Sequence, residues 1–128
     1  MRSCRKVLTI ALCAGAVAVG RASAQEALAR AMELEQAGRF AEAAEAYRAM
    51  LWAAPTDVAA LLGAERTYAQ AGRRDSAAAL AWRALAVDST NRTFHIVLLR
   101  SLRALREDTL ATAAFERWVA VAPRDHSP

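Results

Sequence analysis

The chain of 128 residues is poor in the side chains on which most catalytic and metal sites depend. Its only histidines are His95 and His126, which do not have the spacing of zinc ligands. Ser76 and Ser101 have no base at a spacing typical of nucleophilic catalysis. We therefore expect no enzymatic activity, no catalytic residues, no metal site and no cofactor.

Cysteine and lysine are confined to the first 24 residues, which have the pattern of a secretory signal peptide. A basic start containing Lys6 precedes an apolar run over residues 7–20, and Ala22 and Ala24 are the small residues that signal peptidase reads. The run is shorter than the about 18–20 apolar residues of a membrane span. We expect cleavage after Ala24. The alternative is a leader that is retained as a membrane anchor.

Cleavage would leave a chain without cysteine and with 13 basic and 13 acidic residues. Such a chain has no disulfide, no cysteine-based metal site and no cysteine nucleophile. Its balanced charge gives no reason to expect binding to nucleic acid or to an anionic membrane. Every basic residue after position 24 is arginine and alanine is abundant, a bias typical of GC-rich bacterial genomes. We expect export to the periplasm or the extracellular space of a bacterium.

The sequence repeats with a period of 34 residues, which is typical of a helical repeat architecture. Small or turn-forming residues recur at this spacing: Gly38 and Gly72; Ala43, Ala77 and Ala111; and, two periods apart, Pro55 and Pro123. The period defines three repeats at about 25–57, 58–91 and 92–123. The last five residues, 124–128, have no apolar pattern, and we expect them to form a disordered tail.

Good helix formers dominate each repeat, and the residues that break helices fall between the apolar segments. Loops of two to four residues make the helices of each pair antiparallel. The predicted fold class is all-α, an α-solenoid of three antiparallel helix pairs. The six helices are expected near 26–37, 41–53, 57–71, 75–87, 91–105 and 109–121.

Turn chemistry predicts how these helices begin and end. Gly38 and Gly72 suit the left-handed position that follows a first helix. Short polar side chains at helix starts accept hydrogen bonds from free backbone N–H groups. The expected caps are Asp75 and Asp108 for two second helices, Thr56 or Asp57 for the third helix of the chain, and Thr90 or Asn91 for the fifth.

The repeated alanine predicts the closest contact inside each helix pair. A larger side chain at Ala43, Ala77 or Ala111 would push the helices beyond the usual separation of about 8–10 Å. The aromatic residue four positions later, Tyr47 or Phe115, is expected to fill the space beside that contact.

These features together resemble the tetratricopeptide repeat (TPR) family. The resemblance covers nearly the whole chain after residue 24, through the stretches AGRFAEAAEAY (37–47), AGRRDSAAALAWRAL (71–85) and LATAAFERWVAVAP (110–123). Arg106 and Ser89 depart from the pattern, since they stand where the family favours glycine and proline. The resemblance implies a right-handed superhelix with a concave groove, lined by the first helices, that binds a peptide or a helix of a partner.

The open face of the first helices would form that partner-binding groove. Its expected residues are Met32, Leu62, Arg66, Gln70, Ile96, Arg100 and Arg103. Arg66 and Arg100 lie one repeat apart, and arginine binds carboxylates through two parallel hydrogen bonds. An acidic peptide is therefore one candidate ligand. The alternative is that these arginines are solvated or pair with Glu35, Glu65 or Glu107.

The C-terminal edge is a second candidate interface. Trp118, Val119 and Val121 lie on the last predicted helix, where no further repeat follows to cover them. Exposed apolar patches of this kind mark interaction surfaces. Weak self-association through this edge is expected if the side chains are exposed, and inward packing is the alternative.

The sequence therefore predicts an exported module for protein–protein interaction. One alternative is a membrane-tethered assembly factor of the cell envelope. A second is a purely structural subunit that extends a larger complex. The identity of the partner does not follow from the sequence.

Overall fold

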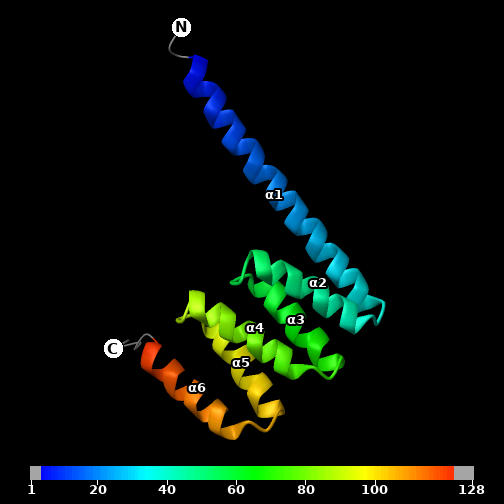
Figure 1. Ribbon diagram of the computed structural model, residues 1–128, viewed down its shortest axis with the longest axis vertical. Helices are drawn as coiled ribbons and strands as arrows, with labels where there is room; N and C mark the ends of the chain where they lie inside the picture. The colour runs from blue at the N-terminus through cyan, green and yellow to red at the C-terminus, as the bar shows by residue number, and fades with distance from the viewer. Residues whose placement is uncertain (1–3, 123–128) are drawn as a thin grey trace, which may run out of the picture.

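A computed structural model describes the backbone of residues 4–122 and the side chains from residue 20 onward. These residues form helices joined by short turns, with no strand among them (Figure 1). The helices are α1 (Cys4–Gln36), α2 (Phe40–Ala53), α3 (Val58–Gln70), α4 (Arg74–Val87), α5 (Arg92–Ala104) and α6 (Asp108–Val121). The predicted all-α solenoid of antiparallel helix pairs is confirmed. Pro123 and the predicted tail 124–128 lie outside the described residues.

The start of α1 differs from the prediction. The helix was expected to begin near residue 26, but it is continuous from Cys4 to Gln36. This segment contains no proline and is rich in alanine and leucine, so nothing in it ends a helix. Its N-terminal part projects beyond the other helices (Figure 1). Cleavage after Ala24 remains a prediction.

The turns inside the three helix pairs share one geometry. At each turn the residue after the helix cap has a positive φ: 74° at Gly38, 73° at Gly72 and 59° at Arg106. In the first turn the amide of Arg39 donates to the carbonyl of Leu34 at 3.0 Å, and the other two turns repeat this bond. This is the Schellman motif, which satisfies the free carbonyls at a helix end. The left-handed position predicted from the glycines is confirmed, and Arg106 occupies it without being glycine.

The helix starts follow the predicted caps only in part. Asp57 accepts a hydrogen bond from the amide of Ala60, and Asn91 accepts one from the amide of Thr93, each at 3.0 Å. The prediction that Asp75 and Asp108 cap second helices is wrong. Each lies inside the first turn of its helix, because the Schellman turn starts α4 and α6 immediately after its last residue. There the two carboxylates face the positive end of the helix dipole.

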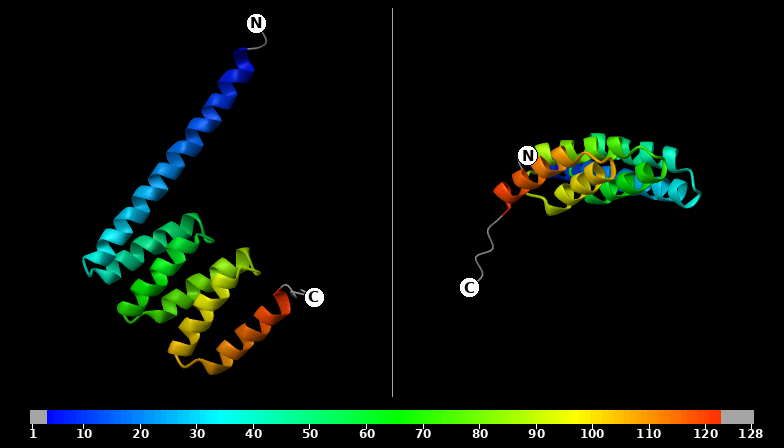
Figure 2. Two further views of the ribbon diagram at one scale, coloured as in Figure 1. Left: turned by 180° about the vertical axis from the view of Figure 1, so that it is seen from behind. Right: turned by 90° about the horizontal axis from the view of Figure 1, so that it is seen from below.

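The core lies between the helices of each pair and between neighbouring pairs. Ala43, Ala77 and Ala111 are buried, as predicted, and Tyr47 is buried beside Ala43. Phe115 was expected to fill the same place in the third pair, but half of its surface is exposed. No helix lies beyond α6 among the described residues, so nothing covers this ring (Figure 2).

The spacing of the helices gives the stack an inner and an outer side. α1 contacts α3 and α3 contacts α5, whereas the second helices of neighbouring pairs are spaced more widely. The stack therefore curves toward α1, α3 and α5. We call the open side of these three helices the inner face. The side formed by α2, α4 and α6 is the outer face.

Candidate functional site

The inner face is formed by the residues of the first helices that the core leaves uncovered. In α3 the buried residues alternate with an open stripe at Leu62, Arg66 and Gln70, spaced four apart. In α5 the corresponding stripe is Ile96, Arg100 and Arg103. In α1 the exposed residue at the equivalent position is Met32. The helices thus bring the predicted groove residues to one side of the stack, and their binding of a partner stays a prediction.

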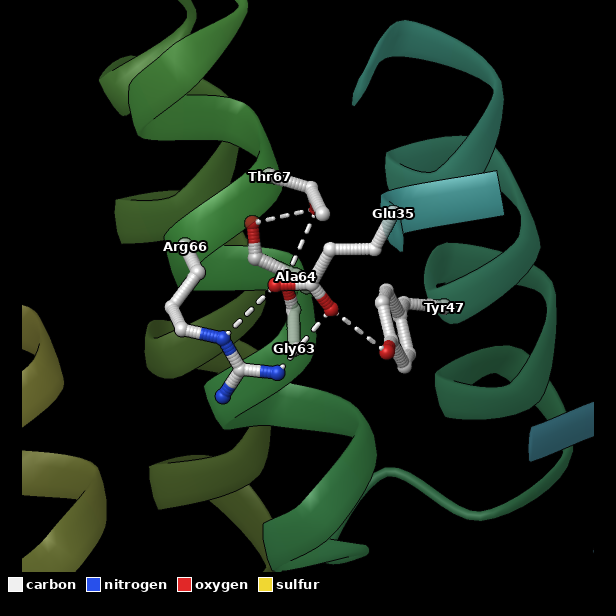
Figure 3. Close-up of polar contacts among 6 residues, drawn as sticks. All are labelled: Glu35, Tyr47, Gly63, Ala64, Arg66 and Thr67. Carbon is white, nitrogen blue, oxygen red and sulfur yellow. Dashed lines mark hydrogen bonds and ion pairs between the residues drawn. The ribbon is translucent and has the colours of Figure 1, made fainter. Parts of the chain in front are cut away.

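A polar network joins α1, α2 and α3 at this face (Figure 3). Arg66 donates from Nε and Nη2 to the two carboxylate oxygens of Glu35, at 2.8 and 3.0 Å. The hydroxyl of Tyr47 donates to the same carboxylate at 2.9 Å. Glu35 therefore ties an exposed arginine to a buried tyrosine.

The same contacts shift the ionisation of these groups. The hydrogen bond from Arg66 holds the pKa of the Glu35 carboxyl below its ordinary value, against the opposing effect of burial. Burial, followed by the neighbouring Glu35 carboxylate, raises the pKa of Tyr47 to about 12. The pKa of Arg66 is raised further by its hydrogen bond to Glu35. All of these shifts favour the ion pair over a wide pH range.

A second ion pair joins α3 to α5. Arg100 donates from Nε and Nη2 to the two oxygens of Glu65, at 2.7 and 2.6 Å. Glu65 is nearly buried, whereas the side chain of Arg100 is 59% exposed. The carboxylate thus holds the arginine in place while leaving most of its surface open.

The alternative in which the inner arginines pair within the chain is therefore the one observed. Arg66 and Arg100 do not form a vacant carboxylate clamp, because each already binds a carboxylate of the preceding repeat. Each pair uses Nε and Nη2 of the arginine. The Nη1 group points outside the pair and can still donate to a ligand.

Arginines one repeat apart also connect the second helices on the outer face. The guanidinium carbon of Arg83 lies 3.7 Å from the ring centroid of Trp52, and that of Arg117 lies 5.5 Å from the ring of Trp82. Both are cation–π contacts. The partner lies 31 residues earlier at the first junction and 35 residues earlier at the second, the same offsets as in the inner ion pairs. Each junction between repeats is thus spanned by one arginine on each face.

Sequence reasoning missed these outer contacts. The 34-residue spacing of Arg83 and Arg117 was present in the sequence and could have identified them. Their tryptophan partners do not share that spacing, because Trp52 and Trp82 are 30 residues apart. The aromatic positions therefore gave no periodic pattern.

The C-terminal edge combines inward packing with exposure. Trp118 is half-buried and stacks on His95, with ring centroids 5.4 Å apart and planes at 8°. Val119 and Val121 remain exposed, at 59% and 39% of their surface, and Phe115 adds to them. The inward alternative thus holds for Trp118 and the exposed one for the two valines.

His95 has a structural environment. Its ring is buried beneath Trp118, and its Nε2 lies 2.7 Å from the carbonyl oxygen of Ser89. In the described part of the chain, no group of three histidine, cysteine or acidic side chains is arranged to hold a metal ion. Likewise, none of the described helices is long and apolar enough to cross a membrane.

The helix-pair stack and the short left-handed turns define the class of fold as a TPR-like helical repeat. Solved structures of the MamA protein share this fold. One gives a TM-score of 0.61 at 23% identity over 77% of this chain, and a second gives 0.56 at 25% identity over 71%. The chain spans just over half of the length of these MamA chains, 54% and 53%. No family model matches the sequence, and no curated protein matches it.

Proposed function

We propose that the chain is a protein–protein interaction module whose inner face binds a peptide or a helix of a partner. The observation that carries the proposal is a row of aliphatic side chains on successive first helices. Leu28, Leu62 and Ile96 are 34 residues apart, and all three are only half-buried. Partly exposed apolar residues at equivalent positions form a continuous strip that an extended segment can cover.

A polar row beside the aliphatic strip supports the same function. Met32, Arg66 and Arg100 occupy equivalent positions four residues further on, and all three are exposed. The carboxylates that hold the two arginines fix their orientation, so little side-chain entropy is lost when a ligand binds. Their remaining N–H donors suit backbone carbonyls or acidic side chains of the partner.

The remaining parts of the proposal rest on the sequence. We propose an exported protein of a bacterium, on the strength of the leader pattern in residues 1–24. We further propose a binding protein without catalytic activity, cofactor or nucleic-acid partner. Weak self-association through Val119 and Val121 is also proposed, because these side chains remain exposed at the end of the stack. The membrane-tethered factor and the structural subunit are the competing functions.

Site-specific photo-cross-linking tests the inner face. A photoreactive amino acid is placed at Met32 or Gln70, both exposed on first helices, and at Ala49, which is exposed on α2, as the control. Irradiation of the cells that produce the chain is expected to yield a discrete protein adduct from the two inner positions. Equal adducts from Ala49, or none from the inner positions, would contradict the proposal.

Mass spectrometry of the protein from the same cells separates the exported form from the tethered one. A mature chain that begins at Gln25 supports cleavage. A chain that retains residues 1–24 and sediments with membranes supports the tethered alternative. A structural subunit would instead remain in a stable complex while its inner positions give no adduct.

A further inference from the structure

The outer face carries a polar hollow between α2 and α4, on the side of the stack opposite the proposed groove. The wider spacing of the second helices leaves a volume of about 300 Å³ here. We call it the outer hollow. The side chains that give it its chemistry are Glu45, Arg48, Trp52, Arg73, Ser76 and Arg83.

The outer hollow is positively charged although the chain after residue 24 is balanced. Three arginines line it against one carboxylate, which leaves an excess of two positive charges. The arginines come from three different segments: Arg48 from α2, Arg73 from the turn before α4, and Arg83 from α4. Folding therefore concentrates cations that are far apart in the sequence, and such a cluster attracts anionic groups.

Glu45 shows how a carboxylate binds in this hollow. One of its oxygens accepts from Nε of Arg48 at 2.8 Å, and the other accepts from the hydroxyl of Tyr68 at 3.1 Å. Arg73 lies 3.6 Å from the second oxygen and also donates to the hydroxyl of Ser76. The donors of the hollow are thus already arranged for a carboxylate.

Arg83 is the member whose hydrogen-bonding groups are open. Its guanidinium stacks over the indole of Trp52, a contact that fixes its plane but uses none of its N–H donors. Among the described contacts no carboxylate or carbonyl accepts from it. The Trp52 side chain beneath it is 60% exposed. A preorganised arginine fork and an exposed aromatic surface therefore lie side by side.

We propose that the outer hollow binds an acidic peptide segment of a partner protein. A carboxylate of the segment binds Arg83 and Arg48, and an adjoining apolar part covers Trp52. A carboxylate fits because Glu45 already occupies the neighbouring donors in the same manner. A peptide fits better than a small inorganic anion because the exposed indole offers apolar surface that such an anion cannot cover. The site is separate from the inner face and does not depend on it.

Fluorescence anisotropy with a labelled hexaglutamate peptide tests the proposal. The full chain is titrated at low ionic strength, where exposed charges are least screened. We expect hexaglutamate to bind and an equally labelled hexaglutamine to bind at least about tenfold more weakly, since bonds to a charged acceptor are the stronger ones. Absence of hexaglutamate binding, or equal binding of hexaglutamine, would overturn the proposal.

Matched variants assign the binding to the hollow. Arg83→Gln is expected to weaken hexaglutamate binding about tenfold, whereas Arg117→Gln, which removes the equivalent arginine one repeat later, should leave it within about twofold. Equal losses in the two variants would show a general charge effect and refute the site. If circular dichroism shows that Arg83→Gln does not fold, Arg48→Gln on the exposed surface of α2 replaces it.

Two further titrations distinguish the outer hollow from a simple anion site and from the inner face. Inorganic phosphate that displaces the peptide at equal concentration would replace the proposal with a simple anion site. Ile96→Glu, on the inner face, should leave hexaglutamate affinity unchanged. A loss in that variant would instead place the acidic peptide on the inner face. Failure of the outer site and failure of the proposed inner function are therefore distinguishable.

Discussion

At the scale of single residues, Gly63 is required by the packing of α3 against α2. A Cβ atom added to Gly63 would lie 2.4 Å from ring carbons of Tyr47, which is closer than real contacts allow. The ring is buried and its hydroxyl is held by Glu35, so it cannot move aside freely. This glycine was not among the turn glycines that the repeat pattern singled out, because it lies inside a helix.

Gly63→Ala is therefore expected to lower the free energy of unfolding by about 1–3 kcal/mol, as overpacking does. In an uncrowded helix the same change stabilises by about 1 kcal/mol, so the sign itself is informative. Urea denaturation measures the effect. Ala59→Gly, at an exposed site of the same helix, serves as the control for helix propensity alone. An increase in stability for Gly63→Ala would mean that Tyr47 does not pack as described.

The ion pair of Glu35 predicts a dependence of stability on acid. The pKa of Glu35 is lowered in the folded state, so its contribution is present above the unfolded value of roughly 4.3. That contribution is lost as the pH falls through the lower folded value. Thermal melting between pH 7 and pH 3 should therefore show a smaller acid-induced loss in Glu35→Gln than in the wild type. Identical losses would show that the pair contributes nothing to stability.

At the scale of helices and turns, the third turn is the weakest of the three. Arg106 adopts a φ of 59°, in the left-handed region that costs a residue with a side chain about 1–2 kcal/mol. Gly38 and Gly72 hold the equivalent positions at little steric cost. The Schellman hydrogen bonds form in all three turns, so the bonding pattern imposes the conformation on Arg106.

Arg106→Gly is expected to raise the free energy of unfolding by about 1 kcal/mol, because the strain is removed without loss of a described contact. Gly72→Arg is the matched reverse change and should lower it by a similar amount. Both are measured by urea denaturation. A destabilised Arg106→Gly would indicate that the arginine side chain makes a stabilising contact at this turn.

The helices themselves were largely predictable from the sequence, and their ends less so. α2 to α6 begin and end within one residue of the predicted positions, because glycine, proline and polar residues separate the apolar segments. Asp57 and Asn91 were correctly predicted as caps, whereas Asp75 and Asp108 were not. The difference is that α4 and α6 start directly from a Schellman turn, whose backbone geometry the identity of capping residues does not reveal.

At the scale of the whole molecule, the period of 34 residues predicted the helix pairs but not the contacts that join them. Arg66 and Arg100 are equivalent in sequence, yet the first binds a carboxylate 31 residues earlier and the second one 35 residues earlier. Arg83 and Arg117 show the same change of offset in their contacts with tryptophan. The partner of each arginine therefore depends on how successive pairs pack, which local patterns do not encode.

The end of the stack also depends on tertiary structure. Phe115 matches Tyr47 in the repeat pattern, but Tyr47 is covered by α3, whereas no described helix follows α6. The same sequence position is thus buried in one repeat and exposed in another. Trp118 escapes this exposure only because His95 provides a flat surface on α5.

The central claim is that the inner face binds the partner, and an affinity measurement on one variant tests it most directly. Ile96 lies on that face, outside the buried core and outside both ion pairs, so Ile96→Glu should fold normally. Calorimetric titration with the partner recovered by cross-linking is expected to show a loss of affinity of about tenfold or more, as for a residue central to an interface. An Ile96→Glu chain that gives an unchanged circular dichroism spectrum and binds the partner as tightly as the wild type would contradict the account.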